Sequence, residues 1–481
     1  MKDFDVIVIG SGIGGLIGAG ILASQGLSLL LVEKNKSPGG YLSSFKRGAF
    51  VFDSAVDCIS GVGTDGLIAS VLKSLGVDNE IDFVRVNPIR VSIFPDREVA
   101  VDSDVNAYID RLITMFPSEA SGIRGFFALA DRAYGTISLI SKPPMYRSAG
   151  PDRISPDLVR LWDITYEELL NEFLKDYRLK AILSDRCPFI GLSPSKVAAL
   201  PMIMLIMSYF RLGAYRPAGG SQRLSDVLVE GIKKNRGRVI FGSCVKKILV
   251  DGRNCIGIVC DDGEEYTSRH IISNADFTHT FTNLLGDKYV SIAKEMLRNP
   301  GVSTSFFLVY AGVKGEFEGH SSTGYFPSYD IINFFKPEAV LKENGTLGIT
   351  VASLEDRLRA PDGYHTVVFH EMVEADGQTF DKPACTDKVL KKAESIIPGI
   401  RGRIEVLDSA TPQTLRRYTG NFHGSAFGWK QVPGFRNMKR HGINNLYIAG
   451  HWGETGGGVL AAAYSGARAA GEILMKEGIK N

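Results

Sequence analysis

The chain has 481 residues, enough for about two to four structural units with buried cores. Its 55 Lys and Arg residues almost balance 53 Asp and Glu residues, so the formal net charge is only +2. A general polyanion-binding role therefore has no support in the composition, and we expect no nucleic-acid partner.

The cysteines and histidines lack the spacing of a metal site. None of the six cysteines forms a CxxC pair, and His370-Glu371 is followed by no second histidine of a zincin helix. We therefore expect no disulfide framework and no metal, and we look for an organic cofactor in a reducing compartment.

The amino terminus has neither the basic region nor the cleavage site of a secretory signal, so we expect a cytoplasmic protein. Residues 6–32 carry no charge and are long enough to span a bilayer, but seven glycines interrupt them in an ordered pattern. A glycine turn between a strand and a helix explains this pattern better than a membrane span.

The amino-terminal elements follow the order of a dinucleotide-binding unit. Residues 5–9 predict a buried strand, residues 10–15 a glycine turn and residues 16–25 a helix. A second strand over residues 27–32 ends in Glu33, 18 residues past the last glycine of the turn. Together these features predict a true dinucleotide fold.

Each part of this unit has a physical task. Gly10 permits the tight turn, Gly12 lets the backbone approach a pyrophosphate, and Gly15 lets helix and strand pack closely. The helix amino terminus supplies amides and a positive dipole to the phosphates. Glu33 can accept hydrogen bonds from both ribose hydroxyls, which disfavours a 2′-phosphate and hence NADP.

A second glycine pair favours FAD over NAD. Gly39 and Gly40 follow the ribose carboxylate after a proline, where bare backbone can lie against a longer cofactor, and residues 50–55 predict a further strand and turn. NAD enzymes do not need this pair.

A comparable unit ends the chain. Residues 445–450 predict one more buried strand, residues 451–458 form a glycine-rich turn, and residues 459–475 predict a helix rich in small side chains. Such a slim helix can lie close to other backbone or to a flat ring. A plain helix-capping loop is the alternative interpretation.

Taken together, these motifs resemble the FAD-dependent phytoene desaturase and carotenoid isomerase (retinol saturase-like) family, relatives of the flavin amine oxidases. The middle of the chain agrees through a proline-glycine-glycine helix entry at residues 215–221 and a meander over residues 245–276. Two positions depart from the pattern of many members: Tyr41 replaces an arginine, and His451 replaces an aspartate.

The resemblance implies non-covalent FAD and a set of residues around it. Gly10, Gly12 and Glu33 would hold the ADP half, the 39–40 pair would line the path of the pyrophosphate and ribityl chain, and the Val245 backbone would meet the adenine. The full cofactor-binding set that we predict is Gly10, Gly12, Ile13, Gly14, Gly15, Glu33, Lys34, Gly39, Gly40, Tyr41, Val245, Gly450, Gly457, Gly458 and Val459.

Chemistry at the flavin supports the carboxyl-terminal turn. Hydride arriving at N5 leaves negative charge near N1 and O2, which amides at residues 457–459 would stabilise. We select His451, Trp452 and Glu454 as candidates for the flavin-facing wall and as candidate catalytic residues. Each has a structural alternative, namely a backbone hydrogen bond, core packing and helix capping, respectively.

Two inserts predict a second domain. Residues 76–214 read as mainly helical and contain the uncharged stretch 198–210 with three methionines, Met202, Met204 and Met207. This stretch is either a buried core helix or a tunnel wall or membrane-dipping lid, and the mean hydropathy of +0.02 is high for a plainly soluble protein. Residues 277–405 predict an antiparallel sheet that floors the pocket.

We therefore predict an α/β fold: a Rossmann-type FAD-binding domain (GR2-like) with a discontinuous α+β substrate domain of antiparallel sheet plus helices. The FAD-binding domain comprises residues 1–75, 215–276 and 406–481, and the substrate domain comprises residues 76–214 and 277–405 with the apolar helical insert.

The predicted function is an FAD-dependent oxidoreductase that desaturates, saturates or isomerises double bonds of a hydrophobic isoprenoid or polyene, such as a carotenoid or retinoid. Two alternatives remain: a flavin amine oxidase acting on an amine, and a non-catalytic prenyl-lipid escort protein on the same scaffold. The expected partner is a hydrophobic small molecule, with peripheral membrane association left open and the oligomeric state undetermined.

Overall fold

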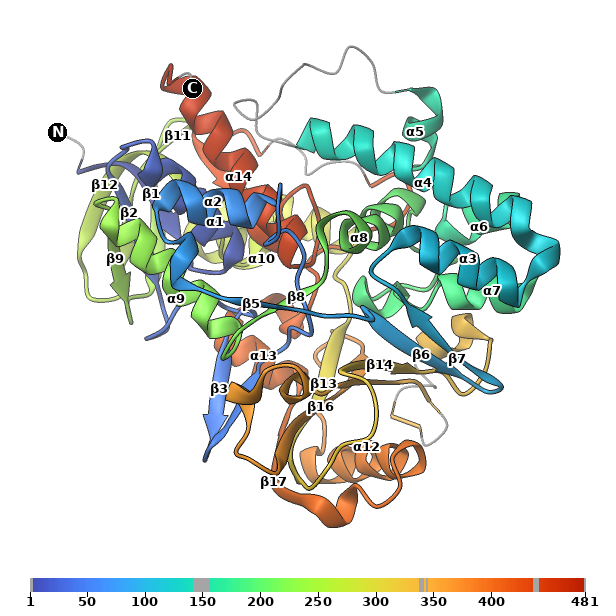
Figure 1. The fold of residues 1–481 in the computed structure, drawn as a ribbon. Coiled ribbons are helices and arrows are strands. Elements are labelled where there is room, and N and C mark those ends of the chain that lie inside the picture. The colour runs from blue at the N-terminus through green and yellow to red at the C-terminus, as the bar shows by residue number, and fades with distance from the viewer. Residues whose placement is uncertain (1–2, 142–154, 337–340, 343–344, 436–440, 480–481) are drawn as a thin grey trace.

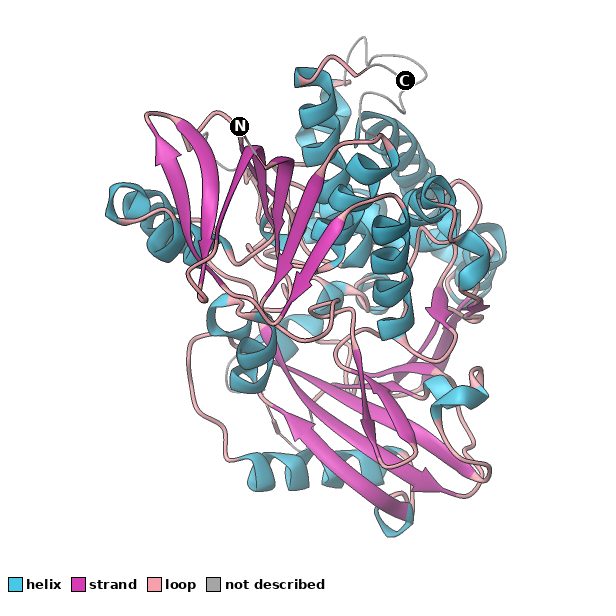
Figure 2. Cartoon of the chain, turned by 90° about the vertical axis from the view of Figure 1, so that its left-hand side faces the viewer, coloured by secondary structure: helices cyan, strands magenta, loops and turns pink. Residues whose placement is uncertain are grey.

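The computed structural model describes residues 3–141, 155–336, 341–342, 345–435 and 441–479. Two large β-sheets dominate it, one above the other in Figure 2, with most helices packed beside them. The amino- and carboxyl-terminal segments lie on the same side of the molecule (Figure 1).

The first sheet is parallel at its centre. Its order there is β18 (Leu446–Ile448), β12 (Glu265–Ser273), β1 (Phe4–Ile9), β2 (Leu29–Glu33) and β9 (Arg238–Phe241). An antiparallel meander of β10 (Val245–Asp251) and β11 (Asn254–Cys260) continues from β12. The strands of the amino-terminal unit are buried on both faces, as expected for a parallel sheet, and the Rossmann-type prediction is confirmed.

Helices cover one face of this sheet, and the meander of β10 and β11 packs on the other face. The covering helices are α1 (Ile13–Ser24), α2 (Leu67–Leu75), α9 (Ser221–Lys234) and α14 (Val459–Lys476). Nearly every residue of α1 is buried, because the helix packs against the sheet, α9 and α14 at once. This explains why its sequence has no polar face.

The second sheet combines segments from both inserts. Its order is β17 (Ile404–Ala410), β13 (Ser305–Lys314), β16 (Tyr364–Val373), β15 (Leu347–Thr350), β14 (Ser322–Tyr325), β6 (Arg90–Phe94) and β7 (Arg97–Val101). All neighbours are antiparallel except β14 and β6, and α12 (Lys382–Ile396) covers one face. The antiparallel prediction for the second insert is confirmed, whereas β6 and β7 are strands within a segment predicted to be mainly helical.

Most of the remaining described part of the first insert is helical and has its own apolar core. It comprises α3 (Val105–Met115), α4 (Ala120–Ser141), α5 (Pro156–Arg160), α6 (Tyr166–Phe173), α7 (Tyr177–Leu183) and α8 (Ala199–Leu212). Among the described residues, no helix combines the length and apolar character needed to cross a bilayer.

Short elements join these layers. They are the hairpin β3 (Ser44–Arg47) and β4 (Phe50–Asp53), the pair β5 (Phe83–Arg85) and β8 (Tyr215–Pro217), and the helices α10 (Phe277–His279), α11 (Val290–Arg298) and α13 (Pro412–Thr419). The division into an FAD-binding and a substrate domain, with its boundaries, stays a prediction.

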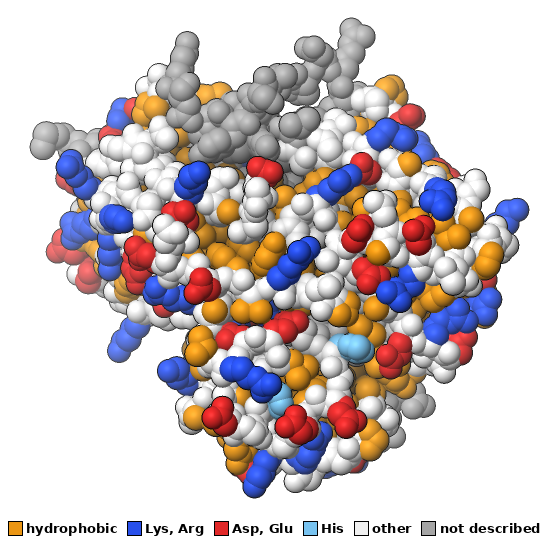
Figure 3. Space-filling model, in the orientation of Figure 1, with side chains coloured by type: hydrophobic (Ala, Val, Ile, Leu, Met, Phe, Trp, Pro, Cys, Tyr) orange, Lys and Arg blue, Asp and Glu red, His pale blue; other side chains and the backbone are white. Residues whose placement is uncertain are grey.

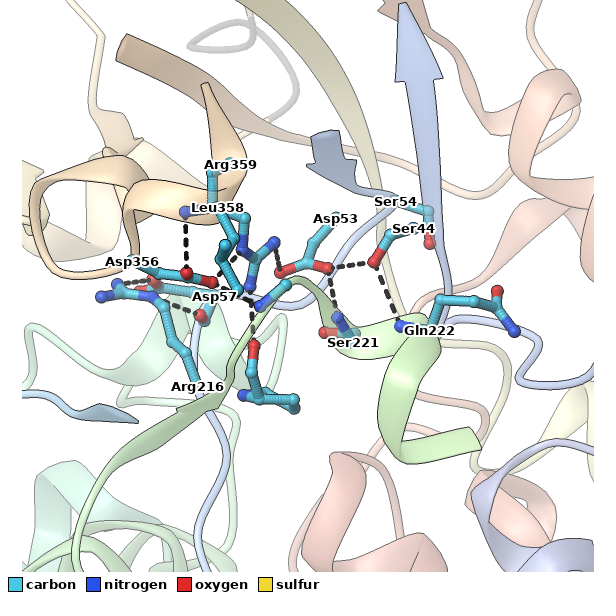
Figure 4. Close-up of polar contacts among 12 residues, drawn as sticks. Ser44, Asp53, Ser54, Asp57, Arg216, Ser221, Gln222, Asp356, Leu358 and Arg359 are labelled. Atoms are coloured by element: carbon cyan, nitrogen blue, oxygen red, sulfur yellow. Dashed lines mark hydrogen bonds and ion pairs between the residues drawn. The ribbon is translucent and has the colours of Figure 1, made fainter. Parts of the chain in front are cut away.

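A buried ionic network joins the end of β4 to the start of α9 and to Asp356 and Arg359 (Figure 4). The Arg359 guanidinium donates to Asp53 and Asp356, at 2.8 Å each, and is fully buried. Asp53 also accepts from the backbone N–H of Ser221, 2.7 Å away, at the start of α9. These contacts fix the end of β4 and the start of α9 against the segment that follows β15.

We expect Arg359→Met to lower the free energy of unfolding by about 3–5 kcal/mol, because two buried carboxylates lose their cation. Denaturant unfolding of the purified protein measures this change. Arg223→Met is the control, since its pair with Glu230 is exposed and should contribute about 1 kcal/mol or less. Equal, small effects of both substitutions would contradict the structural role of the network.

Candidate functional site

A cavity of about 520 Å³ lies between the two sheets, within the usual size range of small-molecule sites. One end is lined by the turns after β1, β2 and β18 and by the start of α14. The other end is lined by α8 and by strands β14 to β16 of the second sheet. The cavity therefore joins segments that are far apart in the sequence.

The first glycine turn faces this cavity. Gly10, Gly12, Ile13 and Gly14 line it, and α1 begins at Gly12 without a side-chain cap. Gly15 does not line it: a Cβ there would lie 2.1 Å from the Gly10 carbonyl oxygen, so this glycine serves the close packing of turn and helix. The uncapped amides at the start of α1 suit a phosphate group.

Glu33 lies at the end of β2, on the cavity wall, and is largely engaged with its own loop. One carboxylate oxygen accepts from the Ser11 N–H at 2.8 Å and the Ser11 hydroxyl at 2.7 Å, and the other accepts from the Asn35 N–H at 2.9 Å. A carboxylate offers about four acceptor positions. The described contacts therefore leave room for about one further donor, rather than for both hydroxyls of a ribose.

The second glycine pair lies against the first turn. The Gly39 N–H donates to the Ser11 carbonyl oxygen at 2.9 Å, and Gly39 forms a parallel bridge with Gly12. Gly39 and Gly40 both line the cavity, as do Lys34 and Val245. The structure thus brings the predicted contacts for the ADP half together along one wall.

Tyr41 follows this pair and also lines the cavity. Its hydroxyl donates to the Ser425 carbonyl oxygen at 2.8 Å, and burial raises the pKa of this tyrosine to about 12. Tyr41 therefore stays neutral, and its hydrogen bond fixes the loop that follows α13. The arginine found at this position in many family members would be charged.

The carboxyl-terminal turn also lines the cavity, directly beside the first glycine turn. Gly450, Gly458 and Val459 line the cavity, and α14 begins at Gly458, again without a side-chain cap. Gly458 has φ +99°, and a Cβ built there would meet no atom within 4 Å, so the space in front of it is open. Gly457 is outside the cavity lining, because it packs against Phe427.

The three candidates for the flavin-facing wall separate in the structure. His451 lines the cavity, whereas Trp452 is buried in the core and donates its Nε1–H to Asn421 Oδ1 at 2.9 Å. Glu454 pairs with Arg468 at 2.7 Å beside a separate, smaller cavity, which does not fit the wall position predicted for it.

His451 is held on both sides. Its Nδ1 lies 3.2 Å from the Ala426 carbonyl oxygen and its Nε2 lies 3.1 Å from Asn421 Oδ1. Burial lowers the pKa of His451 to about 4, so the ring is neutral at physiological pH. It can then shape the wall and donate one hydrogen bond, but it carries no charge toward a cofactor.

Asn274, a residue missing from the predicted site, lies between the two glycine turns. It follows β12, its side chain lies 3.4 Å from the Gly10 carbonyl oxygen, and it lines the cavity. A Cβ on Gly450 would lie 2.5 Å from its Oδ1. The sequence does contain an indication of this role: an asparagine directly follows a buried strand, which is where binding residues usually lie in such sheets.

The substrate half of the cavity is apolar with few charges. Leu205 and Tyr209 of α8 line it, whereas Met202 and Met207 are in the helical core. The stretch 198–210 is therefore a core helix with one face on the cavity. The other apolar or aromatic residues of this half are Pro188, Phe189, Phe306, Tyr325, Phe326, Phe334, Phe335, Leu347, Ile349 and Met372.

The residues around the first half fit a flavin dinucleotide. Two helix amino termini without side-chain caps face one cavity, and Gly458 leaves open space in front of one of them. These are the donors that a pyrophosphate and the N1 edge of a flavin need.

We expect Gly12→Val to abolish FAD retention, because the added side chain enters the space of the pyrophosphate and its Cβ would lie 2.9 Å from Asn274 Nδ2. Flavin absorbance per polypeptide after gel filtration measures retention, and far-ultraviolet circular dichroism reports folding. Gly135→Ala, at an open helical position, should retain FAD fully. Full retention in a folded Gly12→Val protein would place the cofactor elsewhere.

Comparisons with known proteins agree with this geometry. The sequence model of a family described as "Flavin containing amine oxidoreductase" matches residues 13–474. Prolycopene isomerase 1, chloroplastic, of an Oncidium hybrid cultivar is 26% identical, over 100% of this chain and 85% of that protein. Phytoene desaturase (lycopene-forming) of Pantoea ananas is 24% identical, over 97% and 98%, respectively. A putrescine oxidase structure shares the fold with a TM-score of 0.67 and 15% identity, over 98% of this chain and 99% of that chain.

Proposed function

Because the chain belongs to the family of flavin-containing amine oxidoreductases, we propose that it desaturates, saturates or isomerises double bonds of a hydrophobic isoprenoid or polyene by hydride transfer at the flavin. It is an FAD-dependent oxidoreductase. The observation that carries the proposal is one continuous cavity with glycine turns at one end and aromatic and aliphatic walls at the other.

The named relatives support the polyene class. Prolycopene isomerase and phytoene desaturase act, by their names, on carotenoids, and each matches nearly the whole chain. The apolar wall from α8 and the second sheet suits such a substrate, because a conjugated hydrocarbon offers shape and surface rather than hydrogen bonds.

The chain's own residues contribute alignment and exclusion of water. When bound, FAD supplies the hydride acceptor or donor. The amides at the start of α14 would stabilise negative charge at the cofactor, while the neutral His451 and Tyr41 would close the wall between cofactor and substrate. The apolar half would hold the reacting carbon chain in a dry environment.

The amine oxidase alternative finds less support in the cavity. A cationic amine needs a carboxylate that is free to pair with it, in addition to aromatic walls. Within the described residues, the acidic side chains that line the cavity are Glu33, Asp57 and Asp276. Each already accepts hydrogen bonds from other groups of the chain. The cavity also presents a cation, Arg90, which would repel an amine.

The escort alternative rests on the shared scaffold alone. An escort protein has no need of two glycine turns that keep the cofactor end clear, yet Gly12, Gly40 and Gly458 all line this cavity. A cavity built for both cofactor and chain favours catalysis.

We further propose a hydrophobic small molecule as the partner and a cytoplasmic location with peripheral contact to a membrane surface, from which such a substrate would enter. Hydrophobic side chains gather in a band across the face shown in Figure 3, and charges of both signs are interspersed around it. The division into an FAD-binding and a substrate domain, with the boundaries given above, is part of this proposal.

The direct test incubates the FAD-loaded protein with phytoene, prolycopene or retinol in detergent micelles, with the flavin either oxidised or reduced and without oxygen. We expect the polyene absorption spectrum to change with one of them, and we expect no reduction of the flavin by putrescine or cyclohexylamine. Rapid flavin reduction by an amine, with every polyene unchanged, would favour the amine oxidase.

A further inference from the structure

One cation in the cavity has no close charge partner among the described residues. Arg90, the first residue of β6, lines the substrate half and is only 6% exposed. Its Nε is buried without a hydrogen-bond acceptor among the described residues. Within the described residues, its ion pair with a carboxylate is long: Arg90 Nε lies 4.0 Å from Asp185 Oδ2.

Nearby charges do not neutralise this site. Asp185 Oδ2 accepts from the Ser92 hydroxyl at 2.6 Å, and Asp185 Oδ1 is also shared with a second buried arginine, Arg186, at 3.8 Å. Two buried guanidinium groups therefore face one carboxylate, and Arg186 Nε and Nη2 lack acceptors within the described residues as well.

Asp57, the other carboxylate in this half, is already engaged. Its Oδ1 accepts from Arg216 Nη2 at 2.7 Å and its Oδ2 accepts from the Ser322 hydroxyl at 2.6 Å. It attracts Arg90 only from a distance, and burial lowers the pKa of the Arg90 guanidinium. His370, on the same wall, is neutral because burial lowers its pKa to about 4.

The surrounding structure makes room for this guanidinium. A Cβ on Gly324 of β14 would lie 2.1 Å from Arg90 Nη2, so a larger residue there would displace the arginine. The Phe189 ring lies beneath it, with its centroid 5.0 Å from Arg90 Cζ. The position is therefore built into the fold rather than left by chance at a surface.

A buried arginine stays protonated, so the desolvation penalty of its positive charge remains unless an anion pairs with it. A hydroxyl or carbonyl oxygen would satisfy a donor but would leave the charge unbalanced, whereas a carboxylate does both, in a geometry that a guanidinium matches. We infer that Arg90 binds the carboxylate of an amphipathic substrate, a hydrophobic polyene or isoprenoid chain that ends in a carboxylic acid.

This inference rests on the proposed function and sharpens it. A chain anchored by its acid end at Arg90 extends along the apolar wall toward the glycine turns, so the distance from the carboxylate selects which double bond meets the flavin. A hydrocarbon without polar ends has no such anchor.

The test compares binding of all-trans-retinoic acid and its methyl ester to the FAD-loaded protein at pH 7.5, followed by the change in flavin absorbance. We expect the acid to bind about tenfold to a hundredfold more tightly than the ester, from the charged hydrogen bonds that only the acid makes. In Arg90→Met the two ligands should bind within about threefold of each other. Arg124→Met, exposed on α4, should keep the full preference.

The wild-type comparison decides the matter even where Arg90→Met fails to fold. If acid and ester bind equally to the wild-type protein, the carboxylate anchor is wrong and the polyene proposal stands. If neither binds to protein with a full complement of FAD, both the anchor and the polyene proposal are overturned. A preference for the acid that persists in folded Arg90→Met would also reject Arg90 as the anchor.

Discussion

The closest backbone contact between α1 and α14 sets the geometry of the whole site. A Cβ on Gly466 of α14 would lie 1.9 Å from the Gly14 carbonyl oxygen, and a Cβ on Gly14 would lie 2.5 Å from the Gly450 nitrogen. Helices with side chains at these positions would have to separate. This close approach brings the starts of both helices, neither of which has a side-chain cap, onto one cavity.

Buried charge is the second constraint, and the molecule treats it in two ways. Several buried ions away from the cavity are paired closely, as in Arg359 with Asp53 and Asp356 or Lys392 with Glu371 at 2.9 Å. Within the described residues, the buried guanidinium groups of Arg90 and Arg186 lack such a close pair, and of these two only Arg90 lines the cavity. The close pairs fix the end of β4 and helix α12 to their neighbouring segments, whereas Arg90 places a charge in an otherwise apolar wall.

The sequence was sufficient for the features that depend on local order. Strand, glycine turn, helix and acid occur within 33 residues, and their spacing alone predicted the first sheet and the turns that line the cofactor end. The small-residue helix at the other end of the chain was equally clear. The family resemblance added the cofactor and the class of reaction.

What the sequence could not supply depends on contacts between distant segments. The pairing of β6 with β14 joins residues more than 200 positions apart, so nothing local marks residues 90–101 as part of the second sheet. Trp452 and Glu454 neighbour a cavity residue in sequence, yet the short turn after β18 directs them into the core and toward Arg468, respectively. Arg90 is recognisable only when its burial and missing partner are seen.

The decisive measurement is the absorbance spectrum of the purified protein, recorded before and after denaturation and compared with the polypeptide concentration. We expect about one FAD per chain, released intact on denaturation, because the two glycine turns hold it without a covalent bond. A colourless protein that also fails to take up added FAD would show that the cavity between these helices serves another ligand.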